Sequence, residues 1–166
     1  MTDVIRPAPA ALVIAVIGAA TILGAYFFQY VVGLPPCPLC LEQRIPYYVA
    51  IPLALIVAVM ALRNAPPALV RGGLVLLTLA MLVSAGLGVY HAGIEWSWWT
   101  GPTECSGGPL NLNTITDITQ QAKTAVVIRC DQAAWRFLGL SLAGYNALIS
   151  LALAGVALAG AFAKKS

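Results

Sequence analysis

Charged residues are scarce in this chain. Asp, Glu, Lys and Arg make up 9% of its 166 residues, and 60% of the residues are hydrophobic. A soluble domain carries about 25% charged residues, so the composition excludes a soluble fold with a large core. The nine basic residues are dispersed and form no cluster. The net charge of +3 therefore does not indicate a nucleic-acid partner.

Metal ligands and cofactor motifs are also few. His91 is the only histidine, and Cys37–Cys40 is the only C-x-x-C among four cysteines. A structural zinc site takes four ligands, typically from a repeated C-x-x-C or a C-x-x-C with paired histidines. We therefore expect no metal. The sequence also lacks haem motifs, flavin fingerprints and iron–sulfur spacings.

Four stretches carry no charge at all. They lie between Arg6 and Glu42, Arg44 and Arg63, Arg71 and Glu95, and Arg136 and Lys164. A membrane span needs about 20 residues, with a range of about 17–25, and the shortest gap has 18. We expect one all-α integral membrane domain over 1–166, a four-transmembrane-helix bundle with spans at about 8–30, 41–62, 72–91 and 137–162. The pairs Ser84/Gly88 and Gly155/Ala159 are small enough to let another helix approach closely.

The loop charges predict the orientation of the bundle. With four spans, both termini share one side, which holds five basic residues against one acidic, while the other side holds four basic and five acidic residues. By the positive-inside rule both termini are cytoplasmic. The outer loops, about 31–40 and 92–136, then hold all four cysteines on an oxidising side. Residues 8–30 are about twice as long as a signal-peptide core, which favours an uncleaved anchor over a cleaved signal.

The first outer loop contains Cys37-Pro38-Leu39-Cys40-Leu41-Glu42-Gln43-Arg44. Pro46 tolerates only the first turn of a helix, so we expect a helix to begin near Cys40. The partial positive charge of that helix end, and Arg44 four residues on, would both favour the reactive thiolate of Cys40. The alternative interpretation is a structural disulfide or an idle pair of thiols.

The second outer loop holds the other two cysteines. Cys105 lies among glycines and prolines, which indicates a mobile segment. A capping-box pattern at Thr114 and a helical period up to Val126 predict a short amphipathic helix. It lies either on the membrane surface or packed on the bundle. Cys130 follows it.

Four thiols on the oxidising side form either two fixed bridges or an electron relay. The mobility expected at Cys105 favours exchange over a fixed bridge. Since no other redox motif is present, a lipid-soluble quinone is the natural acceptor. Of fourteen aromatic residues, all but Phe162 fall toward the outer half of the membrane. That asymmetry reflects either an outer aromatic belt or a site for a flat ring.

These residues together resemble a known family. The C-P-L-C-L-E-Q-R segment at 37–44, the two later cysteines and four apolar spans are similar to the bacterial disulfide-bond-formation protein B (DsbB) family. The Tyr90-His91-Ala92-Gly93 junction, the Gly101-Pro102-Thr103-Glu104-Cys105 segment and Trp135-Arg136-Phe137-Leu138-Gly139-Leu140 strengthen the resemblance. It extends over nearly the whole chain.

The resemblance implies a thiol:quinone oxidoreductase of the bacterial inner membrane, with its cysteines on the periplasmic side. A periplasmic thioredoxin-like oxidase (DsbA) would attack a Cys105–Cys130 disulfide, with Cys105 forming the mixed disulfide and Cys130 resolving it. Electrons would pass to a Cys37–Cys40 pair. Cys40 would then engage ubiquinone or menaquinone from the membrane pool. Arg44 and His91 would lie at the quinone site, although His91 also fits an ordinary interfacial histidine.

Three rivals remain open at this point. A vitamin-K-epoxide-reductase-like enzyme is also a four-helix relay, but its loop cysteines precede the C-x-x-C, whereas here they follow it. A metal-handling membrane protein is disfavoured by the single histidine and the nearby arginine. A structural membrane protein with two fixed disulfides is the simplest alternative.

Overall fold

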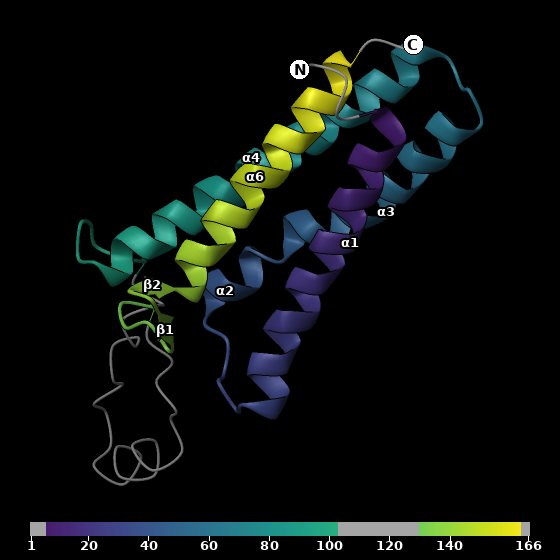
Figure 1. Ribbon diagram of the computed structural model, residues 1–166. Helices are drawn as coiled ribbons and strands as arrows, with labels where there is room; N and C mark the ends of the chain where they lie inside the picture. Colours follow the sequence, from purple (N-terminus) through teal and green to yellow (C-terminus); the bar gives the residue numbers. More distant parts are fainter. Residues whose placement is uncertain (1–5, 103–129, 164–166) are drawn as a thin grey trace, which may run out of the picture.

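Four long helices form the protein (Figure 1). The computed structural model describes residues 6–102 and 130–163. The long helices are α1 Pro7–Tyr26, α3 Ile45–Leu62, α4 Pro67–Glu95 and α6 Leu142–Phe162. The predicted four-helix membrane bundle is confirmed. The amphipathic helix predicted near 114–126 lies outside the described residues.

The helices are built to be surrounded by lipid. Four segments are long and apolar enough to cross a membrane, namely Pro7–Val31, Pro38–Leu62, Pro67–Glu95 and Leu142–Phe162. Large apolar side chains face outward along all of them, whereas alanines make up much of the interior. Because lipid is as apolar as leucine, close packing of small residues holds such helices together. The chain is therefore a multi-pass membrane protein.

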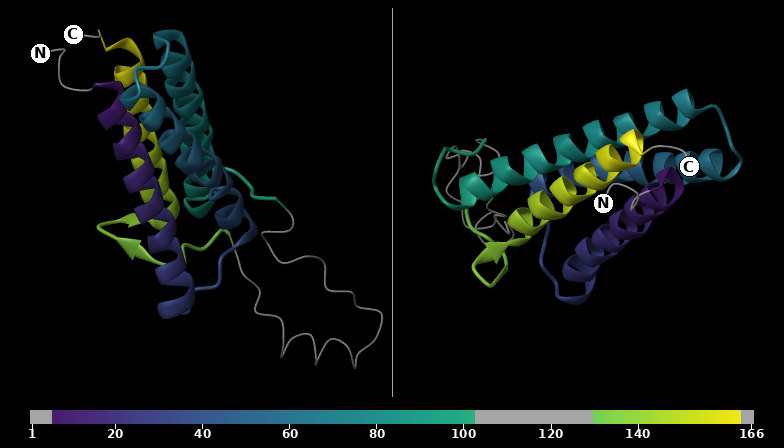
Figure 2. Two further views of the ribbon diagram at one scale, coloured as in Figure 1. Left: turned by 90° about the vertical axis from the view of Figure 1, so that its right-hand side faces the viewer. Right: turned by 45° about the horizontal axis from the view of Figure 1, so that its top comes forward.

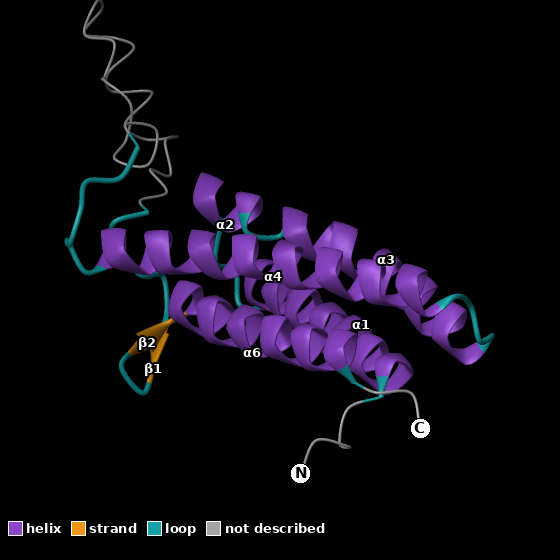
Figure 3. Ribbon diagram, turned by 90° about the horizontal axis from the view of Figure 1, so that it is seen from above, coloured by secondary structure: helices purple, strands orange, loops and turns teal. Residues whose placement is uncertain are grey.

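The four helices pack in a closed order. α1 lies against α3 and α6, and α4 lies against the same two helices; Figures 2 and 3 show the bundle from other sides. Gly88 permits the close approach of α4 to α6, since a Cβ there would lie 2.9 Å from the backbone nitrogen of Ala147. The close contact predicted at Gly88 is thus confirmed. The one predicted at Gly155 is wrong, because nothing lies within 4 Å of a Cβ at that position.

The second span begins earlier than predicted and is interrupted. A short helix, α2 Pro38–Glu42, precedes α3, so the expected start near Cys40 is wrong. Pro38 occupies the first turn of α2, where a missing N–H costs nothing. A helix running through Pro46 would bring its ring against the carbonyl of Glu42. The chain therefore breaks at residues 43–44 and restarts with Pro46 in the first turn of α3.

The fourth span begins later than the predicted residue 137. Two short antiparallel strands, β1 Arg136–Phe137 and β2 Leu140–Ser141, come first. Leu138 and Gly139 between them have φ of 48° and 83°, as a tight hairpin turn of the primed type requires. Ser141 then caps α6 by accepting a hydrogen bond from the Gly144 backbone N–H at 3.2 Å. Helix α1, by contrast, extends through a π-helical turn, η1 Phe27–Val31.

Two ends of the bundle differ in character. The start of α1, the α3–α4 turn and the end of α6 gather at one end (Figure 1). α2 and the hairpin lie at the other end, with His91 in the last turns of α4. A helix of 29 residues is about 44 Å long, whereas the hydrocarbon core is about 30 Å thick. The helix is therefore longer than the hydrocarbon core requires, and its last turns lie beside α2 at this end of the bundle.

Candidate functional site

Cys37 and Cys40 form a close dithiol at the start of α2. Both are free thiols, and their sulfurs lie 2.7 Å apart. Cys37 is the N-cap of α2, and its sulfur accepts a hydrogen bond from the Cys40 backbone N–H at 3.2 Å. A disulfide needs about 2.05 Å between sulfurs, so a small movement closes the bond. The helix start thus positions Cys37, where the sequence predicted Cys40.

The two thiols differ in environment. Cys37 is buried at 4% exposure, whereas Cys40 is half-buried. The pKa of the Cys37 thiol is raised, first by its hydrogen bond with Cys40 and second by burial. Cys37 is therefore the partner that keeps the shared proton, and Cys40 is the partner free to react as a thiolate.

Arg44 lies at the break between α2 and α3, so it is not one helical turn from Cys40 on a continuous helix. Its Nη1 donates to Oε1 of Gln29 at 2.7 Å, and its guanidinium lies 5.3 Å from the ring centroid of Tyr26. Its charge still acts on Cys40 through space. Arg44 is thus a buried cation held in place by α1 and η1, at 8% exposure.

A chain of hydrogen bonds crosses the bundle behind the dithiol. Nδ1 of His91 lies 2.7 Å from the amide nitrogen of Gln43. Oε1 of Gln43 accepts from the amide of Asn146 at 2.8 Å. Oδ1 of Asn146 in turn accepts from the hydroxyl of Tyr47 at 3.0 Å. The chain continues from Tyr47 to Ser150 at 2.7 Å and joins α3, α4 and α6.

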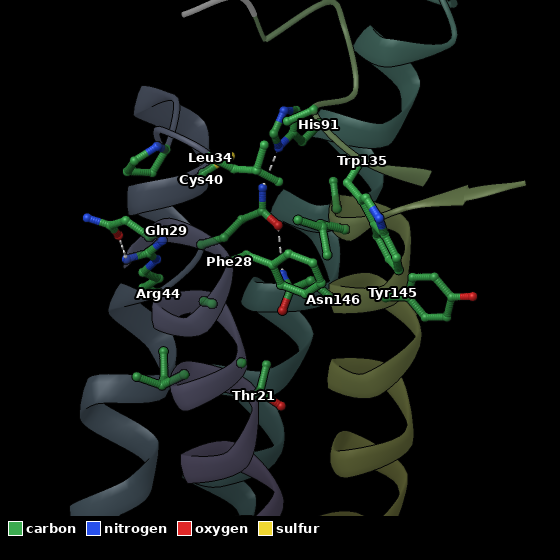
Figure 4. Close-up of a pocket in the computed structure, with 18 of the residues that line it drawn as sticks. Thr21, Phe28, Gln29, Leu34, Cys40, Arg44, His91, Trp135, Tyr145 and Asn146 are labelled. Atoms are coloured by element: carbon green, nitrogen blue, oxygen red, sulfur yellow. Dashed lines mark hydrogen bonds between the residues drawn. The ribbon is translucent and has the colours of Figure 1, made fainter. Parts of the chain in front are cut away.

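A cavity of about 440 Å³ opens beside Cys40 (Figure 4). Its walls are mostly apolar and aromatic, with Phe28, Trp135 and Tyr145 among them. The polar groups that line it include Cys40 of α2, Gln43 and Arg44 at the break before α3, His91 of α4 and Asn146 of α6. A largely apolar pocket with a few convergent polar groups is typical of a small-molecule site. Cys37 does not line it.

Cys130, from the second outer loop, packs against Cys37. Cys130 is 1% exposed and forms one buried cluster with Cys37, Leu39 and Ile94, against which Cys40 packs. Cys130 is disulfide-bonded. Its predicted partner, Cys105, lies outside the described residues, so that pairing stays a prediction.

Glu95 is a buried acid that the sequence did not single out. Its side chain is 5% exposed, and its Oε1 lies 3.8 Å from Nε2 of His91, one turn earlier on α4. Among the described residues its Oε2 finds no hydrogen-bond partner. Nη2 of Arg136 donates to the backbone carbonyl of Glu95 at 3.4 Å, which brings its guanidinium near the carboxylate. The same Nε2 of His91 lies 3.7 Å from the Cys37 sulfur.

Cys37, Cys40 and His91 are close enough to be compared with a metal site, since their ligand atoms lie within 4.8 Å of one another. Zinc–sulfur bonds of about 2.3 Å in a tetrahedron place two sulfurs about 3.8 Å apart. The sulfurs here are 2.7 Å apart, so both cannot ligate zinc as they stand. The geometry suits a disulfide better than a metal, and the absence of a metal stays a prediction.

Several site residues escaped the sequence-based analysis, chiefly Gln29, Gln43, Glu95 and Asn146. Each had a weak signal. Gln43 adjoins Arg44 in the cysteine motif, Glu95 follows His91 by one helical turn, and Asn146 is an amide within an apolar span. A polar side chain inside a span faces the bundle interior or a cavity. That rule alone would have selected Asn146.

Comparisons with known proteins agree with this site. A model of the family "Disulfide bond formation protein DsbB" matches residues 7–160. The chain is 33% identical to disulfide bond formation protein B of Albidiferax ferrireducens, over 76% of this chain and 75% of that one. It is 28% identical to an uncharacterized protein of Rickettsia prowazekii, over 86% and 80% of the two chains.

A third relative, disulfide bond formation protein B of Polaromonas sp., is 28% identical over 80% of this chain and 77% of its own. No solved structure matches the chain. The family match extends from the first turn of α1 almost to the end of α6, and so contains the cysteine motif, His91 and the apolar cavity. With four membrane-spanning helices arranged around a buried dithiol, the chain belongs to the disulfide bond formation protein B (DsbB) family.

Proposed function

We propose that this protein is a dithiol:quinone oxidoreductase of the bacterial inner membrane. It re-oxidises a periplasmic thioredoxin-like oxidase of the DsbA kind, and its cysteines face the periplasm. One observation carries the proposal: the dithiol lies between two environments. Cys40 lines an apolar, aromatic cavity, whereas Cys37 packs in the buried cluster that contains Cys130. Such a dithiol can receive electrons on one side and deliver them on the other.

The proposed electron path balances at each exchange. A thiolate of the reduced partner attacks the Cys105–Cys130 disulfide at Cys105, and Cys130 leaves with the electron pair. The partner's second thiol resolves the mixed disulfide, so the partner is oxidised and the loop pair is reduced. The loop pair then reduces a Cys37–Cys40 disulfide by the same chemistry. Overall, one protein dithiol becomes a disulfide, and two electrons and two protons reach the acceptor.

The cavity fits a quinone head group. Aromatic side chains of Phe28, Trp135 and Tyr145 line it, and flat rings stack well on such side chains. A bound quinone, either ubiquinone or menaquinone, would supply the capacity to accept two electrons and two protons. Cys40 would face it with the reactive sulfur. Arg44 would hold a positive charge where negative charge develops on the ring oxygen.

The potentials support a quinone as the acceptor. A DsbA-type oxidase is itself a strong oxidant at about −120 mV, and about 30 mV corresponds to 1.4 kcal/mol for two electrons. Only a more oxidising acceptor drives electrons away from such a partner. The glutathione pools, at about −180 mV or lower, would drive them the other way.

Trapping the partner tests the proposal. A reduced oxidase that keeps only its attacking cysteine can open the Cys105–Cys130 disulfide but cannot resolve the mixed disulfide at Cys105, so its covalent complex with the wild-type protein should accumulate on a non-reducing gel. The double variant Cys105→Ser/Cys130→Ser should form none. A wild-type protein that reduces neither ubiquinone nor menaquinone with the reduced two-cysteine oxidase, and that traps no single-cysteine oxidase, would refute the function. Two fixed disulfides would then be the better interpretation.

A further inference from the structure

We propose that Tyr47, Asn146 and Gln43 act as positioning residues that hold His91 in one tautomer, with its proton on Nε2, so that the ring presents an N–H to Cys37. The tautomer follows from the hydrogen bonds of the bundle and does not depend on the proposed function. Its use, stabilising a thiolate during disulfide exchange, does rest on that function.

The first observation is the direction of the hydrogen bonds. The Tyr47 hydroxyl donates to Oδ1 of Asn146, which leaves the Asn146 amide nitrogen to donate to Oε1 of Gln43. With its oxygen engaged, Gln43 turns its amide nitrogen toward Nδ1 of His91 at 2.7 Å. An amide nitrogen only donates. Nδ1 must therefore accept, and a neutral ring then carries its proton on Nε2.

The second observation is independent and concerns the other ring nitrogen. Nε2 faces the carboxylate Oε1 of Glu95 at 3.8 Å and the sulfur of Cys37 at 3.7 Å. A carboxylate is a hydrogen-bond acceptor, and so is the Cys37 sulfur, whose own proton is shared with Cys40. A donor at Nδ1 and acceptors at Nε2 demand the same tautomer. His91 is 3% exposed, so water competes little for either nitrogen.

Two charged side chains, Glu95 and Arg136, bear on the protonation of the His91 ring. Glu95 faces Nε2, and Arg136 attracts Glu95. Cys37 and Cys40 approach from α2. Because Gln43 is uncharged, no group at Nδ1 favours a second proton on the ring. His91 is thus held as a neutral donor and does not act as a base toward the thiols.

Cys37 then has two N–H groups aimed at its sulfur. The Cys40 backbone N–H lies at 3.2 Å, and Nε2 of His91 lies at 3.7 Å. While Cys40 is a free thiol, their mutual hydrogen bond keeps the proton on Cys37. When the proposed quinone acceptor draws electrons from Cys40, that hydrogen bond is absent and the two N–H donors remain to stabilise a Cys37 thiolate. That thiolate would attack the Cys40 sulfur and close the disulfide, and the electron pair and the Cys37 proton would pass to the acceptor.

The single histidine makes the tautomer measurable. Nitrogen-15 histidine labels only His91 in this chain, and NMR shifts and N–H couplings show which nitrogen carries the proton. We expect one neutral form with the proton on Nε2 near neutral pH. Tyr47→Phe removes the nearer of two hydroxyl donors to Oδ1 of Asn146, the other being that of Ser150 at 3.5 Å, and Asn146→Ala breaks the chain. Both should yield a mixture of the two tautomers, although neither variant changes a residue that touches His91.

Tyr48→Phe is the matched control, because the Tyr48 hydroxyl bonds to Tyr26 instead, outside this chain. It should leave the spectrum unchanged. A wild-type ring protonated on Nδ1 or on both nitrogens would overturn the inference. So would a single Nε2–H form that persists in Tyr47→Phe and in Asn146→Ala. These spectra need no quinone and no partner, so they stand whatever becomes of the proposed function.

The effect on the thiol is measured separately. In a Cys40→Ala background Cys37 is the remaining thiol of the C-x-x-C pair, and its alkylation by iodoacetamide is followed at that residue by mass spectrometry against pH. Adding Asn146→Ala should slow alkylation near neutral pH about tenfold, the loss expected for one charge-assisted hydrogen bond, and move the profile to higher pH. Adding Tyr48→Phe should change neither. An unchanged profile with a changed NMR spectrum would refute the role toward Cys37 and leave the tautomer in place.

Discussion

Arg44→Gln tests the electrostatics of the cavity most directly. This substitution removes three interactions of Arg44. They are a charged hydrogen bond to Gln29 at 2.7 Å, a cation–π contact with Tyr26 at 5.3 Å, and a through-space attraction on the Cys40 thiolate. A glutamine still reaches the same region and can hydrogen-bond to Gln29. The substitution therefore removes the charge with little loss of volume.

The magnitudes separate two possible roles of Arg44. Arg44 acts on Cys40 through space, so thiol reactivity should change by only about twofold, the effect of a weak charge–charge interaction. A preorganised donor aimed at developing negative charge is worth about 10²–10³ in kcat. We expect quinone-dependent turnover to fall about 100-fold, or about 2.7 kcal/mol, with alkylation of Cys40 nearly unchanged.

The assay follows quinone absorbance with a reduced thioredoxin-like oxidase as electron donor, at several quinone concentrations, to obtain kcat and KM. Arg63→Gln is the matched control, since Arg63 is exposed at the far end of α3. Arg44→Lys keeps the charge without the planar fork and should fall between the two. Turnover within about threefold of wild type in Arg44→Gln would refute the role, because that is far less than loss of one preorganised donor costs.

Three further predictions concern packing, thiol order and the polar chain. Gly88→Leu should lower the free energy of SDS-induced unfolding by more than about 2 kcal/mol, because the larger side chain would force α4 away from α6. Gly86→Leu, with open space around it, should change that free energy little. Mass spectrometry of the reduced protein should show Cys40 alkylated before Cys37 near neutral pH, because the raised pKa of Cys37 keeps its thiol protonated. Gln43→Met removes two buried hydrogen bonds and should lower unfolding free energy by about 1–3 kcal/mol in the same titration.

The bundle was predictable because charge cannot be buried cheaply in lipid. Four uncharged stretches of at least 18 residues suffice to predict four spans. The ends of those spans were less predictable, since caps and turns decide them. The residues Phe137-Leu138-Gly139-Leu140 are as apolar as those of a membrane-spanning helix. Positive φ at Leu138 and Gly139 nevertheless makes this segment a hairpin. The glycine was the only local sign of that turn.

The candidate site divided in the same way. Cys37, Cys40 and Arg44 were found from local spacing, because all three lie within one short motif. The hydrogen-bonded chain was not found, because its partners lie far apart in the sequence. Gln43 and His91 are separated by 48 positions, and Gln43 and Asn146 by 103. No period or motif in one helix reports which residue faces it from another. Only the packing of α4 against α6 brings Asn146 to Gln43 and His91.

Interruption of the second span explains why the dithiol faces two environments. In an unbroken helix from Pro38, Gln43 would lie on the same stripe as Cys40. The break that Pro46 imposes at residues 43–44 frees the five-residue α2 from the line of α3. Cys37 then caps α2 inside the cluster with Cys130, while Cys40 borders the cavity. In the proposed relay Cys37 meets the loop cysteines and Cys40 meets the acceptor. The loop cysteines therefore need not enter the cavity.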